Sequence, residues 1–273
     1  MINIGIIGFG SMGKMLTNGF LLLDIIPQEN LFIFSRTLSK VEIIKEQYKA
    51  VQICNTNLEV VKNSDIIFIC TPPNQVKSVL LEISGVMTQT KYIVSIAAYI
   101  SLDNIESIIK GQISKVIPSF VSEVNEGVFL VCHNKNVIKS NKDQLNKIIS
   151  KLGIIYEINE SQFEIYTDIT SCSPGIFSSI FSEFLKSACK HGDINGNDAL
   201  EMFIQTLYGL SKIYKERHID FNETIKRVAR KGGITEIGIS VVNDKAPALF
   251  DDIFEKTLAK HEIRKQEFVK EFS

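Results

Sequence analysis

The sequence predicts an α/β fold in which a doubly wound parallel sheet is followed by an all-helical half. In the first half of the chain, short apolar runs typical of buried strands alternate with segments of helical periodicity, which is the pattern of βαβ units. From about residue 161 onward only helical periodicity is present. The 273 residues suffice for two domains, which we expect at 1–160 and 161–273.

The first strand and the loop after it carry the strongest motif. Residues 4–7 form a β-branched apolar run, and Gly8, Gly10 and Gly13 follow with the spacing G-x-G-x-x-G before a helix over 12–23. In a dinucleotide-binding domain the first glycine makes a tight turn and the second lets the backbone approach a pyrophosphate. The third lets the helix pack closely on the strand. The motif predicts a Rossmann-like nucleotide site; the alternative is a tight turn without a ligand.

The loop after the second strand distinguishes between cofactors. The strand is expected at 31–34, and Ser35, Arg36 and Thr37 follow it with no Asp or Glu. An acidic residue here typically holds the ribose 2′-hydroxyl of NAD, whereas an arginine suits a 2′-phosphate. The loop therefore favours NADP(H), unless Arg36 is an ordinary solvated residue.

The remaining elements of the first half continue the alternation, and we expect a parallel sheet throughout. Thr71 and Pro72 follow a buried strand and end it, at the sheet edge where ligands bind in such folds. Ala97 and Ala98 follow another strand; two small residues permit a flat ring to approach, although they are equally ordinary in packing. The expected strands are 51–54, 65–70, 92–95, 113–117, 127–132 and 153–158, and the expected helices are 41–48, 57–62, 74–83, 101–109 and 142–152.

The second half reads as five helices, at 163–172, 175–191, 197–217, 222–230 and 246–268. The helix over 175–191 has more apolar surface than a lone surface helix should show. We therefore expect a homodimer, with higher assembly left open. Pro174 should break or kink the helical path.

A glycine pair in the second half is a candidate binding loop. Gly232 and Gly233 precede a helical segment and offer bare backbone N–H groups, and Arg230 and Lys231 add positive charge. Together they are suited to a small carboxylate. The alternative is a helix linker with a solvated basic pair, since helices often end at glycine.

Composition excludes several classes of function. The net charge of −1 gives no basic footprint for nucleic acid, and no apolar run approaches the ~18 residues of a membrane span. The start lacks a basic secretory leader, so we expect a cytoplasmic protein. The five cysteines form no C-x-x-C pair and should be reduced thiols; the four scattered histidines predict no metal site.

Taken together, the motifs resemble the pyrroline-5-carboxylate reductase family over nearly the full length. The matching pieces occur in order: Gly8-Phe9-Gly10-Ser11-Met12-Gly13, Ser35-Arg36-Thr37, Ser95-Ile96-Ala97-Ala98, Val116-Ile117-Pro118, Glu126-Gly127, Thr170-Ser171-Cys172-Ser173 and Gly232-Gly233-Ile234-Thr235. The resemblance implies reduction of the cyclic imino acid pyrroline-5-carboxylate to proline, with NADPH preferred over NADH, by a dimer or a ring of dimers.

The resemblance also implies roles for individual residues. Gly8, Gly10, Ser11, Met12 and Gly13 would wrap the pyrophosphate; Ser35, Arg36 and Thr37 would form the 2′-phosphate loop, with Asn57 by the adenosine; Thr71 and Pro72 would lie beside the cofactor, and Ala97 and Ala98 would border the nicotinamide. On the substrate side are Ser171, Ser173, Arg230, Lys231, Gly232 and Gly233, and Thr235 is the catalytic hydroxyl nearest the ring nitrogen.

The sequence departs from the family pattern only on the substrate side. The family has Met-Pro-Asn where this chain has Ile117-Pro118-Ser119, and it has Ser-Pro where this chain has Arg230-Lys231. Its Ser-Gly-Ser-Gly-Pro-Ala stands where this chain has residues 171–176, with the Gly-Pro order inverted. The segments Ile117-Pro118-Ser119 and Lys231-Gly232-Gly233-Ile234-Thr235 resemble those of the ComER-type late-competence branch of the family. The departures leave two alternatives to pyrroline-5-carboxylate reduction: reduction of a different, more acidic imine, and a non-catalytic NADP-binding regulatory protein.

Overall fold

The computed structural model describes residues 2–273, which pack as two compact units. One unit consists of residues 2–172 and 257–273, and the other of residues 173–256. The packing thus groups residues 161–172 and 257–273 with the sheet. The division at residue 160, which marks where the alternation of strands and helices ends, stays a proposal about domains.

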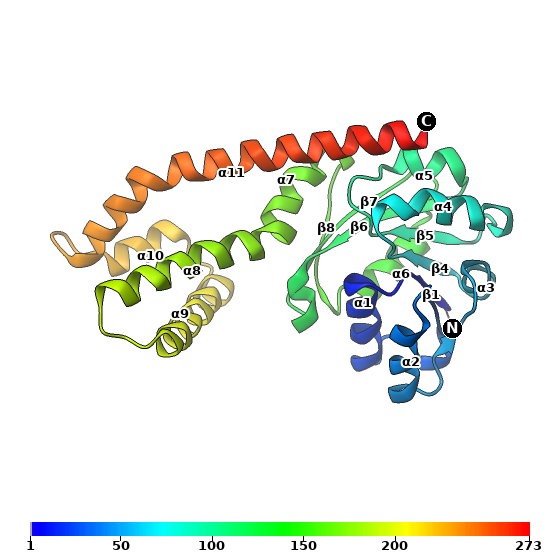
Figure 1. Cartoon of the computed structure of the whole chain (residues 1–273), viewed down its shortest axis with the longest axis horizontal. Helices are drawn as coiled ribbons and strands as arrows, with labels where there is room; N and C mark the ends of the chain where they lie inside the picture. The colour runs from blue at the N-terminus through cyan, green and yellow to red at the C-terminus, as the bar shows by residue number, and fades with distance from the viewer. Residues whose placement is uncertain (1) are drawn as a thin grey trace. The chain divides into compact units, whose positions relative to one another are not determined.

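The first unit is built on one eight-stranded sheet with the order β3-β2-β1-β4-β5-β6-β7-β8 (Figure 1). This confirms the predicted α/β class. The strands are β1 (Ile4–Ile7), β2 (Leu31–Phe34), β3 (Gln52–Ile53), β4 (Ile66–Ile69), β5 (Tyr92–Ser95), β6 (Gln112–Pro118), β7 (Gly127–His133) and β8 (Gly153–Glu157). The helices of the unit are α1 (Ser11–Leu22), α2 (Leu38–Gln47), α3 (Asn57–Asn63), α4 (Pro73–Ile83), α5 (Leu102–Ile108), α6 (Lys139–Ile149) and α7 (Phe163–Thr167).

Helices cover both faces of the sheet, and each face has its own hydrophobic core. Because side chains alternate along a strand, Ile6 belongs to one core and its neighbour Ile7 to the other. Helices α1, α2 and α6 contribute to the core with Ile6; α3, α4 and α5 contribute to the core with Ile7. The last turns of the C-terminal helix add Phe268 and Phe272 to this second core. Burial on both faces explains why the strands are continuous apolar runs.

The prediction of an all-parallel sheet is wrong at one strand, because β7 runs antiparallel to β6. The connection between them holds only a short 3-10 helix, Phe120–Val124. A parallel return needs a crossover of a dozen or more residues, so this short connection reverses the chain direction. The other strand pairs are parallel.

The second unit is helical. It contains α8 (Ser173–His191), α9 (Gly196–Arg217), α10 (Phe221–Val228) and the first part of α11 (Ile234–Phe272), whose residues from Thr257 onward belong to the first unit. The helix expected to begin at residue 246 therefore begins at Ile234. Its first turns are rich in β-branched residues, which have low intrinsic helix propensity, and Pro247 lies inside the helix. Both features hid this part of the helix from the sequence pattern.

The helical path changes just before Pro174, where a break or kink was expected. Helix α7 ends at Thr167, and a π-helical turn over Asp168–Cys172 precedes α8. A π turn is wider than an α turn and places residues four apart on one side.

The described residues include no helix long and apolar enough to cross a membrane.

A buried polar group in the sheet gives the fold a pH dependence. His133 of β7 lies opposite Ser114 of β6, with 2.5 Å between its Nδ1 and the Ser114 hydroxyl. The hydroxyl of Tyr92 lies 2.6 Å from the same Ser114 oxygen. Burial, with Lys142 adding to it, lowers the pKa of His133 to about 4, although Glu157 acts in the opposite direction.

We expect the free energy of unfolding to fall as the pH drops from about 6.5 to about 4. In this range the unfolded chain binds a proton at residue 133 and the folded chain does not, so acid favours unfolding. Solvent screening near the exposed Glu157 limits the loss to roughly 1–2 kcal/mol. Urea unfolding at several pH values measures it. His133→Asn should flatten this part of the profile, and an unchanged slope in that variant would assign the titration to other groups.

Candidate functional site

A cleft of about 420 Å³ lies in the first unit where the strand order reverses. Strand β1 pairs with β2 on one side and with β4 on the other, so β1 is at the switch point of the sheet. The loops that follow these three strands line the cleft, as expected for ligand sites in open α/β sheets. Predicted site residues in its lining are Gly8, Gly10, Ser35, Arg36, Thr37, Asn57, Thr71 and Pro72.

Each glycine of the motif has a geometry that fits the expected role. Gly8 has φ = +95°, and a Cβ there would lie 2.9 Å from the backbone nitrogen of Thr71. A Cβ at Gly13 would overlap the carbonyl oxygen of Gly8, so this glycine allows α1 to pack on the β1 loop. Gly10 has nothing within 4 Å of its missing Cβ. The space beside Gly10 is therefore open to a ligand.

The N-terminus of α1 lies at the end of the same loop. Gly10 is the N-cap residue, no side chain caps the helix, and its first turn contains no acidic residue. The first amides of a helix have no intrahelical partner, and the helix dipole makes this end positive. This is an anion site made of backbone. Ser11, Met12 and Gly13 form this first turn and are not among the residues that line the cleft.

Two cations, Arg36 and Lys40, line the cleft beside the loop that follows β2. Arg36 is exposed, and Ser35 is buried with its hydroxyl oxygen 3.3 Å from the amide nitrogen of Thr37, which donates to it. Lys40, one helical turn beyond Arg36, also lines the cleft. Lys40 was not among the predicted site residues, although its position four residues after Arg36 could have indicated that it lies near that side chain. Two cations without a carboxylate in this loop are suited to a phosphate.

Further residues define the walls of the cleft. Asn57 is buried, and its side-chain amide donates to Glu82 Oε2 at 2.7 Å. Glu82 also lines the cleft and was not predicted. The Oγ1 atom of Thr71 is buried without a hydrogen-bond partner within residues 2–273. Because buried polar groups are normally satisfied, this orphaned hydroxyl fits a ligand group as its missing partner.

Ala97 and Ala98 lie apart from this lining. Ala97 is buried, with its amide nitrogen 3.4 Å from the Ser95 hydroxyl at the end of β5. Ala98 lines a separate small cavity together with Tyr99 and Lys115. Burial lowers the pKa of Lys115, although Glu160 lies 3.6 Å away. The role of the two alanines stays a prediction.

Two of the segments that depart from the family pattern contact each other. The hydroxyl of Ser119 donates to the carbonyl oxygen of Thr170 at 2.8 Å, and the hydroxyl of Ser171 donates to that of Pro118 at 3.2 Å. The segments around Pro118 and Ser171 are therefore held together by hydrogen bonds from side chains to the backbone. Ser173 begins α8 and belongs to the second unit.

The glycine-pair loop lies in the second unit, immediately before α11. Gly232 has φ = +73°, and its amide donates to Glu236 Oε2 at 2.6 Å. A carboxylate thus already occupies a backbone donor of the loop, as expected if the loop suits carboxylates. Arg230 and Lys231 precede Gly232 in this unit, Gly233 follows it, and Thr235 is exposed in the first turn of α11. Glu236 was not among the predicted site residues.

A doubly wound sheet with a bare glycine turn and a free helix N-terminus at its switch point defines a dinucleotide-binding protein of the Rossmann type. Comparison with known proteins narrows this class. Residues 3–99 match the family model described as NADP oxidoreductase coenzyme F420-dependent, and residues 160–264 match the one for pyrroline-5-carboxylate reductase dimerisation. Pyrroline-5-carboxylate reductase 3 of Bacillus subtilis is 34% identical over 96% of this chain and 97% of its own length.

The chain belongs to the pyrroline-5-carboxylate reductase family, whose members are NAD(P)-dependent oxidoreductases. A crystal structure of the Plasmodium falciparum pyrroline carboxylate reductase with NADP bound is similar, with a TM-score of 0.85 and 25% identity; the match covers 97% of this chain and 98% of that one. ComE operon protein 4 of B. subtilis is also a relative, 25% identical over 96% of both chains. The matched dimerisation region indicates a homo-oligomer.

Proposed function

We propose that this protein reduces pyrroline-5-carboxylate to proline with NADPH. The observation that carries the proposal is the cleft at the switch point. It combines an open backbone at Gly10, an uncapped helix N-terminus and the cations Arg36 and Lys40. The likeness to pyrroline-5-carboxylate reductases over nearly the full chain supports the substrate.

The residues present fit a phosphorylated nicotinamide dinucleotide. When bound, this cofactor supplies a hydride to the imine carbon. Gly8, Gly10, Ser11, Met12 and Gly13 would hold the pyrophosphate, and Ser35, Arg36 and Thr37 the 2′-phosphate. Asn57 would lie by the adenosine, Thr71 and Pro72 beside the cofactor, and Ala97 and Ala98 at the nicotinamide. The preference for NADPH over NADH rests on the two cations in the loop after β2 and on the absence of an acid there.

The substrate side of the proposal rests on the loop before α11. The loop of Gly232 and Gly233 would hold the substrate carboxylate through the Gly232 amide, because the Gly233 amide donates to the Arg230 carbonyl oxygen at 2.8 Å. Arg230 and Lys231 would add charge, and Ser171 and Ser173 would add hydroxyls. The contact between the Gly232 amide and Glu236 supports an affinity of this loop for a carboxylate. Substrate binding would displace Glu236 from that amide.

The protein needs to supply little chemistry beyond positioning. A protonated imine is already electrophilic, so the alignment of the hydride with the imine carbon accounts for most of the rate. The Thr235 hydroxyl would hydrogen-bond the ring nitrogen and fix the face that is attacked. Hydride transfer turns the protonated imine into a neutral secondary amine. This amine then takes one proton from solvent to give the secondary ammonium of proline.

The proposal includes a homodimer as the smallest assembly and a cytoplasmic location. Support for the dimer comes from α8, where Phe177 is 43% and Phe184 is 59% exposed within a single chain. Apolar side chains exposed to this degree are typical of an interface. A reduced compartment agrees with the five free cysteines.

A panel of substrates tests the proposal against its nearest alternative. The positive charges of Arg230 and Lys231 favour, as a second candidate, reduction of a more acidic imine. We expect NADPH oxidation with pyrroline-5-carboxylate to have the highest kcat/KM among five- and six-membered cyclic imino acids with one or two carboxylates. A higher value for a dicarboxylate would favour the second candidate. Tight NADPH binding without turnover of any imine would instead leave a non-catalytic dinucleotide-binding protein.

Substitution of Gly10 separates cofactor binding from folding. We expect Gly10→Ala to keep the unfolding temperature, because nothing lies within 4 Å of the added Cβ. Its NADPH Kd should rise about 10-fold or more, because the methyl group stands where the pyrophosphate approaches the backbone. Gly111→Ala, at another glycine with open surroundings, is the matched control and should leave the Kd unchanged. Equal NADPH affinity in the two variants would remove Gly10 from the site.

A further inference from the structure

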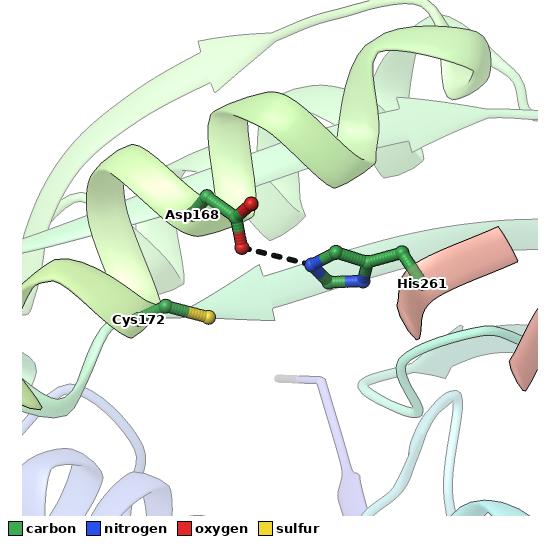
Figure 2. A group of neighbouring side chains, drawn as sticks. All are labelled: Asp168, Cys172 and His261. Atoms are coloured by element: carbon green, nitrogen blue, oxygen red, sulfur yellow. Dashed lines mark hydrogen bonds and ion pairs between the residues drawn. The ribbon is translucent and has the colours of Figure 1, made fainter. Parts of the chain in front are cut away.

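A compact group of metal-ligand side chains lies in the first unit, apart from the cofactor cleft. Asp168 and Cys172 come from the π-helical turn, and His261 comes from the C-terminal part of α11 (Figure 2). One ligand atom from each of the three lies within 4.8 Å of the others. Figure 2 shows all three side chains directed toward one another.

The local backbone places the two ligands of the turn. In a π turn, residues four apart lie on one side, which brings Asp168 and Cys172 together. Such turns are frequent at functional sites. His261 is 93 positions from Asp168 and reaches it only through the fold, with its Nε2 2.8 Å from Asp168 Oδ1. The sequence predicts no metal site because the histidines have no suitable spacing, and spacing alone gives no sign of a contact between residues so far apart in the chain.

The surroundings hold the group in place. Asp168 is 2% exposed and His261 8%, and the Thr257 hydroxyl donates to Asp168 Oδ2 at 2.6 Å. The Tyr99 ring lies 5.6 Å from the His261 ring, and Tyr99 has φ = +70°, an unusual conformation for a residue other than glycine. A hydrogen bond to a ligand carboxylate and packing on a ligand imidazole are the outer contacts that typically orient metal ligands.

We propose that Asp168, Cys172 and His261 form a binding site for one Zn²⁺ ion. Sulfur, imidazole nitrogen and carboxylate oxygen are the ligands zinc takes in proteins, and three of them leave a fourth position for water or another group. In a tetrahedral site, ligand atoms stand about 3.3–3.6 Å apart. The three atoms, which lie within 4.8 Å of one another, would move closer together by side-chain rotation when the ion binds. Binding replaces the hydrogen bond between Asp168 and His261 with two bonds to the ion. The proton of His261 Nε2 is exchanged through solvent to Nδ1, and the thiol proton of Cys172 passes to solvent.

The alternative is that Asp168 is an ordinary buried carboxylate satisfied by its neighbours. Thr257 and His261 both hydrogen-bond it, and the Cys172 sulfur lies within 4.8 Å of one of its oxygens. That arrangement stabilises the fold without an ion. The two cases differ in what the thiol does, since only a metal site needs the thiolate as a ligand.

Metal titration of the full-length protein distinguishes them. After treatment with a chelator under reducing conditions, the protein should bind one equivalent of Zn²⁺ per chain, with an increased unfolding temperature. Cys172→Ser and His261→Gln should weaken binding by at least ~10-fold. Cys189→Ser, at another half-buried free cysteine, is the matched control and should bind like the original chain. Unchanged zinc affinity in Cys172→Ser overturns the proposal.

Cobalt gives a second test that needs no variant. Co²⁺ bound at this site should produce the near-ultraviolet charge-transfer band of a cobalt–thiolate bond and the strong visible bands of a tetrahedral ion. Zn²⁺ should abolish both bands, and Mg²⁺ should not, because it prefers oxygen ligands. Absence of the charge-transfer band overturns the proposal. Neither test uses NADPH or an imine, so failure here is distinct from failure of the proposed reductase activity.

Discussion

Thr235→Val is expected to lower kcat for imine reduction by about 10- to 100-fold while the Kd for NADPH stays within about twofold. The substitution keeps the shape of the side chain and removes only its hydroxyl. A hydrogen bond to a charged group contributes about 1.5–3 kcal/mol, which corresponds to this range when the bond is lost in the transition state. Steady-state kinetics and a fluorescence titration with NADPH measure the two quantities.

The position of Thr235 makes the result easy to interpret. It is exposed in the first turn of α11, so its replacement should not change the unfolding temperature. Thr206→Val is the matched control, because Thr206 is an exposed threonine of α9 whose hydroxyl donates only to a carbonyl of its own helix. This variant should keep the original kcat. If Thr235→Val also keeps it, Thr235 has no part in the reaction.

Arg36→Ala should weaken NADPH binding by about 10- to 100-fold and change NADH binding by less than about threefold. The two cofactors differ only in the 2′-phosphate, and a charge-assisted hydrogen bond to a phosphate is the contact that Arg36 is proposed to make. Lys40 also lines the cleft and retains part of the preference, so Lys40→Ala should have a smaller effect in the same direction.

A control variant separates the loss of a specific contact with the cofactor from the loss of one positive charge in general. Lys45→Ala removes an exposed cation of α2 that does not line the cleft, and it should leave both affinities unchanged. Calorimetric titrations with NADPH and NADH give the ratio of the two Kd values for the original chain and for each of the three variants. Equal weakening of the two cofactors in Arg36→Ala would show that the 2′-phosphate lies elsewhere.

Local sequence features predicted the strands of the sheet and the tight turn after β1. Strands buried on both faces must be continuous apolar runs, and the tight turn after β1 needs glycine at Gly8 for steric reasons. Both requirements act within a few residues, so they are visible in the sequence. Lys40 and Glu82 were missed because each lies in a helix, α2 and α4 respectively, where polar residues are normally solvated.

Features that depend on distant parts of the chain could not be predicted in the same way. The direction of β7 follows from the short connection to β6, while its apolar pattern suits either direction. The start of α11 was hidden by residues of low helix propensity that tertiary packing overrides. The contact of Asp168 with His261 joins positions 93 residues apart. No spacing rule covers such a pair.

The stoichiometry of the products directly tests whether the protein reduces pyrroline-5-carboxylate to proline with NADPH. Purified protein incubated with NADPH and pyrroline-5-carboxylate should form one proline for each NADPH oxidised, with both followed in the same sample. We expect this ratio for the original chain, and a decrease of both signals by about fivefold or more in Gly10→Ala at NADPH concentrations near the original Kd. NADPH oxidation without proline, or no oxidation at all with a cofactor-saturated protein, would contradict the proposed activity.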